Sequence, residues 1–175
     1  MGLNIGYLKS DKLNDENWTP RYGVSPILKY IPTTSKIWCP FDTEESEYVK
    51  AATERGNDVV YSHIVEGKDF FSYEPDDYDV IVSNPPFSCK DKVLERLYKL
   101  GKPFAVLLPL NSLQGNTRYK YFKQGIQLLT FDKRIGFYTP EHTESPVEGC
   151  PFASAYFCKD VLPRDLIVEE LLKEV

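Results

Sequence analysis

At residues 79–87 the sequence reads Asp79-Val80-Ile81-Val82-Ser83-Asn84-Pro85-Pro86-Phe87. The short apolar, β-branched run near its start is typical of a buried strand. The two prolines that follow fix φ and carry no backbone N–H, so the strand ends in a rigid, extended turn. The stretch therefore predicts a buried strand whose carboxyl end presents Asn84 and Phe87.

Short apolar runs of the same kind recur along the chain, and polar segments with helical spacing separate them. The expected strands cover residues 35–39, 58–62, 79–83, 103–108, 126–131 and 153–158, and the expected helices cover 26–31, 43–55, 90–100 and 164–174. Prolines and a glycine interrupt residues 137–151, which are expected to form a long loop. The alternation of strands and helices predicts an α/β fold with a mostly parallel sheet flanked by helices.

The chain has the size of one domain. Its 175 residues, 42% of them hydrophobic, suffice for one packed core, so residues 1–175 are expected to form a single domain with no separate target-recognition domain. No apolar run reaches the roughly 20 residues of a membrane helix, and the first residues lack the pattern of a signal peptide. We therefore expect a soluble, cytoplasmic protein with no membrane partner.

The charge balance is acidic. Twenty-one Lys and Arg against 26 Asp and Glu give a net charge of −5, so the molecule as a whole does not attract polyanions. A nucleic-acid contact must then be local, with the basic stretch 118–134 as the candidate, although such a run is more commonly a solvated surface. The cysteines form no CxxC pair, so we expect reduced thiols and no metal site at Cys39, Cys89, Cys150 and Cys158.

Polar residues follow the expected strands where a ligand is most commonly bound. In an open parallel sheet, ligands bind beyond the carboxyl ends of the strands. Asp42, His63, Asn84 and Asn111 each follow one of the first four expected strands. We therefore expect these four residues to lie along one edge of the molecule.

The Asn84 turn suits a planar group that carries an NH₂. The Asn84 side-chain oxygen and the Pro85 carbonyl are two acceptors, and Phe87 offers a flat face for stacking. Holding both amine hydrogens would localise the nitrogen lone pair for attack on an electrophilic methyl group, and catalysis would rest on positioning and fixed dipoles. The alternative is a proline-rich turn that only ends a strand.

With these residues the chain resembles the Rossmann-like, S-adenosylmethionine-dependent amino methyltransferases, in which Asn-Pro-Pro-Phe or Asn-Pro-Pro-Tyr is the catalytic motif. It looks most like a compact group of phage and prophage adenine-N6 methyltransferase-like proteins, from Trp18 to about Cys158. The resemblance implies a class I methyltransferase-like sheet whose last strand is antiparallel, with S-adenosylmethionine as the cofactor. It implies catalytic positions at Asn84, Pro85, Pro86 and Phe87.

The resemblance also implies cofactor contacts. Trp18-Thr19-Pro20 is similar to a segment that packs over the methionine part of the cofactor, although Trp18 is equally suited to anchor a helix. Asp69 would accept from the cofactor adenine and Phe70 would pack on its ring; an ordinary turn is the alternative there. The cofactor-binding positions implied are Trp18, Thr19, Pro20, Cys39, Pro40, Phe41, Asp42, His63, Asp69, Phe70 and Ser83.

The chain departs from the family pattern at two places. Asp42-Thr43-Glu44-Glu45-Ser46 stands where glycines normally let the backbone approach the cofactor. Either Asp42 or Thr43 caps the next helix while Glu44 and Glu45 face its positive end and the cofactor, or the cofactor site has decayed. His63 stands where an acid would hold the ribose hydroxyls, and a surface histidine is the alternative.

Loops must read the substrate, because the chain leaves no room for another domain. Adenine in a duplex must be flipped out of the stack before its amine can react. Residues 133–137 resemble the family's late motif, which suggests Phe137 as a second stacking ring and Arg134 as a phosphate contact, against a strand-edge aromatic and a solvated arginine. The substrate-binding positions implied are Phe137, Arg134, Asn111 and Arg118.

We therefore expect methyl transfer from S-adenosylmethionine to the N6 amine of adenine in nucleic acid. DNA is preferred over RNA on the phage-like resemblance alone. Two alternatives stay open: methylation of a glutamine amide in a protein, which the acidic surface would suit, and a catalytically silent binding or decoy protein with a degenerate cofactor loop. The sequence makes no prediction of the oligomeric state.

Overall fold

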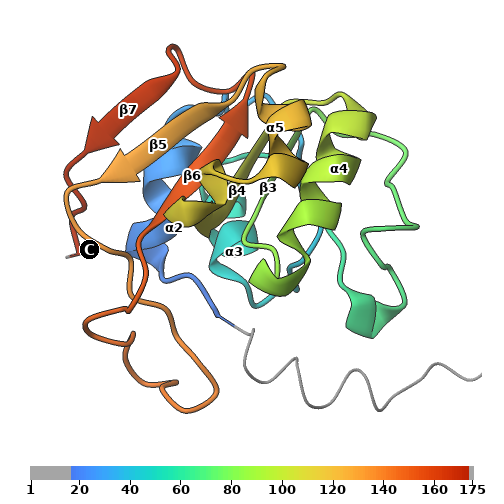
Figure 1. The fold of residues 1–175 in the computed structure, drawn as a ribbon. Helices are drawn as coiled ribbons and strands as arrows, with labels where there is room; N and C mark the ends of the chain where they lie inside the picture. Colours follow the sequence, from blue (N-terminus) through green and yellow to red (C-terminus); the bar gives the residue numbers. More distant parts are fainter. Residues whose placement is uncertain (1–16, 174–175) are drawn as a thin grey trace, which may run out of the picture.

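A computed structural model describes residues 17–173 and shows one sheet with helices on both faces (Figure 1). The helices are α2 (Arg21–Leu28), α3 (Glu47–Glu54), α4 (Lys90–Leu100) and α5 (Asn116–Phe122), with short 3-10 turns η1 (Ile64–Glu66), η2 (Phe87–Cys89) and η3 (Leu110–Leu113). The strands are β1 (Ile37–Cys39), β2 (Val59–Tyr61), β3 (Val80–Ser83), β4 (Phe104–Pro109), β5 (Gln127–Phe131), β6 (Ser154–Lys159) and β7 (Leu166–Glu169).

The sheet confirms the predicted fold class. Its strand order is β2-β1-β3-β4-β6-β5-β7. The predicted last strand, 153–158, forms β6, which inserts between β4 and β5 and runs antiparallel to both. The remaining pairs are parallel. The chain therefore forms a mostly parallel α/β sheet flanked by helices.

One predicted element is wrong. Residues 164–174 were expected to form a helix, but they contain β7, which pairs in parallel with β5. Burial alternates along it, since Ile167 is 5% exposed whereas Leu166 and Val168 are 56% and 62% exposed. The period of two and the branched Ile-Val pair favour a strand, and pairing with β5 outweighs the helical spacing of the leucines.

The other three predicted helices differ from expectation only at their ends, and α5 was not predicted. The helix α4 spans the predicted residues 90–100, and α3 begins four residues later than its predicted start at 43. The helix α2 begins at Arg21 rather than at Pro26, which lies inside it. Pro20 occupies the position before the first turn, where its fixed φ suits a helix start.

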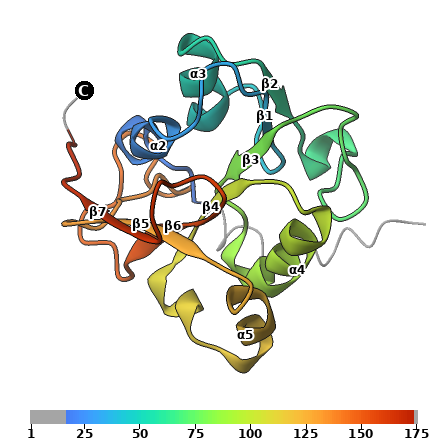
Figure 2. The ribbon, with the colours of Figure 1, turned by 90° about the horizontal axis from the view of Figure 1, so that it is seen from above.

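Each face of the sheet carries its own apolar core. Alternate residues of β4 point to opposite faces, so that Leu107 packs with one core and Val106 with the other. The helices α2 and α3 cover the first face, and α4 and α5 cover the second (Figure 2). Because both faces are covered, the central strands are apolar throughout rather than alternating.

A buried pair of tyrosines fixes the segment before α2. The Tyr156 hydroxyl lies 2.9 Å from the Tyr48 hydroxyl and donates to the Gly23 carbonyl at 2.7 Å. Tyr48 is also hydrogen-bonded to Thr19. These contacts join β6, α3 and α2, and they set the position of the residues that enter the site.

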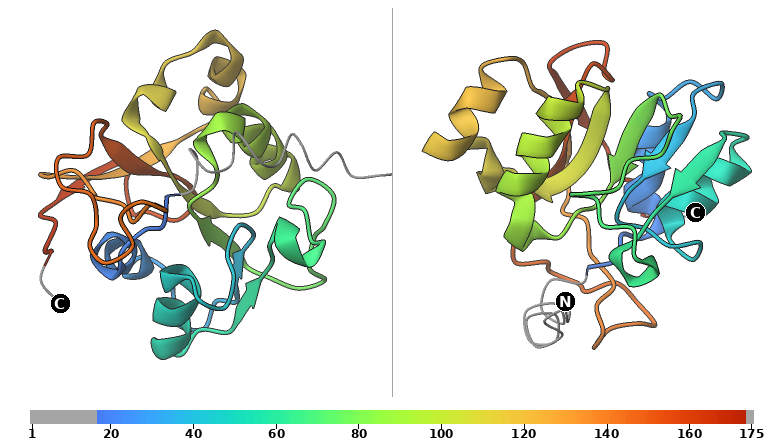
Figure 3. Two further views of the ribbon diagram at one scale, coloured as in Figure 1. Left: turned by 90° about the horizontal axis from the view of Figure 1, so that it is seen from below. Right: turned by 90° about the vertical axis from the view of Figure 1, so that its right-hand side faces the viewer.

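The loop of residues 137–151 projects at the end of the sheet where β5 and β7 finish (Figure 3). It lies beside the first residues that the structure describes, because Trp18 and Tyr138 form an antiparallel bridge. No helix within residues 17–173 has the length and apolar character that a membrane span requires.

Leu94 tests the core between α4 and the sheet. It is 0% exposed, so Leu94→Ala should remove buried contacts and lower the free energy of unfolding by about 2–5 kcal/mol. Urea denaturation followed by circular dichroism measures this change. Leu113→Ala, at a side chain that is 41% exposed, is the matched control and should change stability by less than about 1 kcal/mol. Equal losses in the two variants would contradict the placement of α4.

Candidate active site

Asn84 lies directly after β3, between the ends of β1 and β4. Its side-chain nitrogen donates to the Asn17 carbonyl at 2.8 Å and to Thr19 Oγ1 at 3.1 Å. These two bonds fix which way the amide faces. The side-chain oxygen Oδ1 is buried and has no hydrogen-bond partner among the described residues. A buried acceptor without a donor costs about 1–3 kcal/mol, and such a group calls for an explanation.

The two prolines hold the turn after Asn84 as predicted. Pro86 precedes the turn η2, and its carbonyl accepts from the Cys89 backbone N–H at 3.3 Å. Within residues 17–173 we find no donor to the Pro85 carbonyl oxygen. The turn therefore places two acceptors, Asn84 Oδ1 and the Pro85 carbonyl, next to each other in sequence without a partner from the described chain.

Three phenylalanine rings gather beside this turn. Phe87 and Phe137, both predicted from the sequence, have ring centroids 6.2 Å apart in an edge-to-face arrangement. Phe152 completes the group, 5.5 Å from Phe87 and stacked on Phe137 at 5.8 Å. The sequence analysis missed Phe152, although its place directly after Pro151 at the end of the long loop was a usable signal. Phe137 is only 2% exposed, so its predicted role as a stacking ring for a base stays a prediction.

The segment 17–19 joins Asn84 to the loop that carries these rings. Trp18 and Tyr138 exchange two backbone hydrogen bonds of 2.9 Å each. The Trp18 side chain is 47% exposed, whereas Thr19 is 6% exposed and accepts from Asn84. The predicted Trp18-Thr19-Pro20 segment therefore lies beside Asn84, with Thr19 as its direct contact to the Asn84 turn.

Gly136 lets the long loop pass close to the core. The Tyr22 hydroxyl accepts from the Gly136 backbone N–H at 3.0 Å and lies 3.2 Å from the Gly136 carbonyl oxygen. A Cβ at this position would lie 2.5 Å from the Val147 carbonyl oxygen. Only glycine fits here, because a Cβ atom at residue 136 would clash with the Val147 carbonyl oxygen.

Asp42 is a buried carboxyl group that joins three elements. Its Oδ1 accepts from Ser46 Oγ and its Oδ2 accepts from Ser83 Oγ, both at 2.5 Å. Burial raises the pKa of Asp42 to about 6, and the two serine hydrogen bonds oppose that rise. Asp42 therefore ties the end of β1 to the end of β3 and to the start of α3, in the place where the resemblance led us to expect a cofactor contact.

The expectation that Asp42 or Thr43 caps α3 is wrong. Ser46 is the N-cap residue, and its Oγ accepts from the Tyr48 backbone N–H at 3.2 Å. Residues 43–46 form a turn instead of a first helical turn, since Thr43 accepts from the Ser46 backbone N–H at 3.0 Å. Asp42 thus supports the cap indirectly, through its bond to Ser46.

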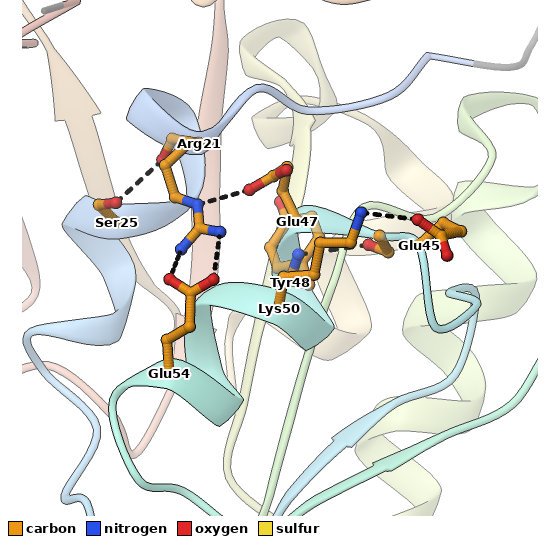
Figure 4. Close-up of polar contacts among 8 residues, drawn as sticks. Arg21, Ser25, Glu45, Glu47, Tyr48, Lys50 and Glu54 are labelled. Atoms are coloured by element: carbon orange, nitrogen blue, oxygen red, sulfur yellow. Dashed lines mark hydrogen bonds and ion pairs between the residues drawn. The ribbon is translucent and has the colours of Figure 1, made fainter. Parts of the chain in front are cut away.

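The acids near α3 pair with nearby cations (Figure 4). Glu45 binds Lys50 at 2.7 Å, and this lowers the pKa of Glu45. Arg21 of α2 reaches both Glu47 at 2.5 Å and Glu54 at 2.7 Å. Glu45 is therefore paired with Lys50 on the surface, and its predicted role stays a prediction. Glu44 is exposed on the turn, and its predicted role stays a prediction.

The end of β2 and the segment after it hold local turns. The His63 ring nitrogen Nδ1 accepts from the Val65 backbone N–H at 3.2 Å, and Asp69 Oδ1 accepts from the Phe71 backbone N–H at 3.0 Å.

Phe70 is 2% exposed, between Trp38 at 5.5 Å and Phe41 at 4.8 Å, with the Arg96 guanidinium 5.4 Å from its ring centre. Phe70 therefore packs in the core, and its predicted contact with the cofactor adenine stays a prediction.

The remaining predicted cofactor positions lie at or directly after the ends of β1 and β3. Cys39 is 0% exposed at the end of β1, and burial raises the pKa of its thiol. Pro40 is buried next to it, and Phe41 packs on Phe70. Ser83 is 0% exposed and donates to Asp42. These residues hold the strand ends in place.

Arg118 is engaged within the protein. Three of its N–H groups donate, to the Ser112 carbonyl at 2.6 Å, to the Gln114 carbonyl at 2.5 Å and to Asp91 at 2.7 Å. It closes the loop between β4 and α5, and its place among the substrate-binding positions stays a prediction.

Arg134 and Asn111 are exposed, as a substrate contact requires. Arg134 also donates to the Cys150 carbonyl at 2.9 Å, which closes the long loop. Their predicted roles stay predictions.

Two hollows on the described surface are lined by residues other than those of the Asn84 turn. One of about 220 Å³ is lined by α2 and α3, including Arg21 and Glu54, and one of about 360 Å³ is lined by residues 141–145 of the long loop. In residues 17–173 no group of three or more His, Cys, Asp or Glu side chains is arranged to hold a metal ion. The site therefore consists of the Asn84 turn, the three rings and the segment 17–19.

No protein-family model and no curated protein sequence matches the chain. Among solved structures, it is similar to a Listeria monocytogenes protein described as a candidate class I S-adenosylmethionine-dependent methyltransferase, with a TM-score of 0.47 and 12% sequence identity over 95% of this chain and 69% of that one. At this level of similarity the other protein's activity does not transfer to this chain, so a functional assignment rests on the geometry of the site itself.

Asp42 gives the protein a measurable pH dependence. Its pKa of about 6 lies above the value near 3.8 for an unburied carboxyl, so the folded state holds the proton more tightly than the unfolded state does. The resulting stability is full at low pH and is lost as the pH rises through 6. Relative to Asp42→Asn, which has no titrating group there, the wild-type free energy of unfolding should fall by about 2–3 kcal/mol between pH 4 and pH 7. Urea titrations across that range check it, and parallel pH profiles for the two proteins would contradict the burial of a titrating carboxyl.

Proposed function

We propose that this chain transfers a methyl group from S-adenosylmethionine to an exocyclic amine, with the N6 amine of adenine in nucleic acid as the acceptor. One observation carries the proposal. The Asn84 side-chain nitrogen donates to the segment 17–19, and its buried oxygen, directly after a central parallel strand, has no partner in the described part of the chain. An amine with two hydrogens supplies the donors that Asn84 Oδ1 and the Pro85 carbonyl lack.

The chemistry follows from these two acceptors. The lone pair of an aromatic amine is delocalised into its ring, and acceptors on both hydrogens reduce that delocalisation. Asn84 Oδ1 and the Pro85 carbonyl also fix the position of the substrate's amine nitrogen. Such positioning by fixed groups provides most of the rate enhancement in a preorganised site. Since Asn84 Oδ1 is buried, the residues above it must move aside when the substrate enters.

The residues at the ends of β1 and β2 fit the cofactor in part. Asp42 and Phe70 are engaged within the protein, so they would support the site from behind. Asp69 would hold the cofactor, because within residues 17–173 its turn uses Oδ1 and Oδ2 is left for a ligand. The contact predicted for His63 is kept as part of this proposal. When bound there, S-adenosylmethionine supplies an electrophilic methyl group on a sulfonium.

Features around the turn favour a nucleobase as the acceptor. Phe87 is partly buried at the edge of the three-ring group and can offer a flat face to a planar base. Lys133 and Arg134 are exposed in the segment that leads to Phe137, whereas the whole chain carries a net charge of −5. A local basic contact beside aromatic rings suits a nucleic-acid strand in which the target base is unstacked from its neighbours.

Asn84→Ala tests the assignment directly. The variant removes the acceptor oxygen and should lower methyl transfer by about 10²–10³-fold, as the loss of one fixed hydrogen-bond group does in other enzymes. The assay incubates the protein with methyl-labelled S-adenosylmethionine and single-stranded DNA or RNA, and follows N6-methyladenosine by nucleoside mass spectrometry. Asn116→Ala, at an exposed amide on α5, is the matched control and should keep full activity.

Circular dichroism must show that Asn84→Ala is folded for the result to count. Undiminished transfer by the folded variant would refute the role of Asn84. Label that enters only protein in a cell extract would favour a glutamine amide as the acceptor. Absence of cofactor heat in calorimetry of the folded wild type would favour a silent binding protein.

A further inference from the structure

The strand β7 is an open edge of the sheet. It stands last in the strand order, and within residues 17–173 it pairs with β5 alone (Figure 1). Its bonds to β5 come from odd-numbered residues, because the Asp165 carbonyl accepts from Leu128 at 2.7 Å and the Glu169 carbonyl accepts from Asp132 at 3.1 Å. Backbone groups alternate in direction along a strand, so those of Leu166 and Val168 point away from the sheet.

This edge lacks the usual protection against pairing. Natural edge strands are kept apart by shortness, by Lys or Pro within the strand, or by a covering element. The opposite edge, β2, has only three residues. The strand β7 reads Leu-Ile-Val-Glu, without Lys or Pro, and its Leu166 and Val168 side chains are 56% and 62% exposed. An exposed apolar edge of this kind is a template for another strand.

We propose that β7 pairs with β7 of a second copy of this chain, in an antiparallel arrangement about a two-fold axis at Ile167. In that register, Leu166 of each copy lies opposite Val168 of the other. Both residues have outward backbone groups, so each such pair exchanges two hydrogen bonds. Their exposed side chains then meet across the axis as a cross-strand pair. The two sheets join into one.

The charges beside the strand fit the same register. Antiparallel pairing about Ile167 brings Arg164 of one copy opposite Glu170 of the other, and symmetry repeats the pair. Both residues are exposed, at positions just outside the two ends of β7. A two-fold interface must be complementary to itself, and opposite charges at equal distances from the axis satisfy that condition. The inference is independent of the proposed function.

Sedimentation velocity of the full chain over a range of concentrations tests the proposal. The wild type should show a species of twice the 20.2 kDa chain mass that dissociates on dilution. Val168→Pro removes an outward N–H without removing a bond to β5, so it should be folded and monomeric. A wild type that stays monomeric at the highest soluble concentration overturns the proposal. So does a Val168→Pro variant that is folded, with an unchanged thermal midpoint, and still dimeric.

A charge swap tests the register. Arg164→Glu and Glu170→Arg each place like charges opposite each other and should weaken the dimer about tenfold or more. The double variant Arg164→Glu/Glu170→Arg restores two opposite-charge pairs and should recover the wild-type dissociation constant. Lys92→Glu, an equal charge change at an exposed site on α4, is the control and should leave the dimer unchanged. Single variants that match the control, or a double variant weaker than either single, would overturn this register.

Discussion

The site depends on how the Asn84 amide is held. Its nitrogen has two acceptors, the Asn17 carbonyl and Thr19 Oγ1, and both belong to a short segment at the start of the described chain. That segment is fixed from the other side, because Tyr48 bonds Thr19 and also meets Tyr156. The same segment carries the bridge from Trp18 to Tyr138, next to the ring of Phe137. The Asn84 amide and the segment that it binds therefore connect the end of β3, the start of α2 and the long loop.

A carboxylate takes the place that a glycine-rich turn would have. Glycines in such a loop let the backbone approach a cofactor, whereas here Asp42 turns inward and joins Ser46 and Ser83. Where glycines would bring the backbone close to a ligand, the Asp42 carboxyl instead connects β1, β3 and α3 through hydrogen bonds. Desolvation of the carboxyl is the energetic cost of that connection, and it is visible in the raised pKa. A cofactor at this edge must be held by groups farther along the strand ends.

The sequence predicted most of the sheet, because buried parallel strands are short, apolar and β-branched. It failed at residues 164–174, where leucines at helical spacing coincide with a branched Leu-Ile-Val run and long-range pairing with β5 decides the outcome. In the site, the Asn84 turn, its prolines and the meeting of Phe87 with Phe137 were predictable from motif and strand order. The engagement of Arg118 was not predictable, because the Ser112 and Gln114 carbonyls reach it through the geometry of an irregular loop and Asp91 comes from a different helix. The packing of Phe70 was not predicted either, since its neighbours Trp38 and Arg96 come from β1 and α4 and are distant in sequence.

The insertion of β6 between β4 and β5 has a consequence for how the chain folds. Residues 104–109 and 127–131 leave the ribosome before their common neighbour at 154–159 exists. Until then the first four strands can assemble with α2, α3 and α4, but the β4 edge remains open and β5 and β7 have no route into the sheet. Completion of the sheet is thus a late, long-range step, which favours slow folding and makes the nascent chain most vulnerable to aggregation just before residue 159 emerges.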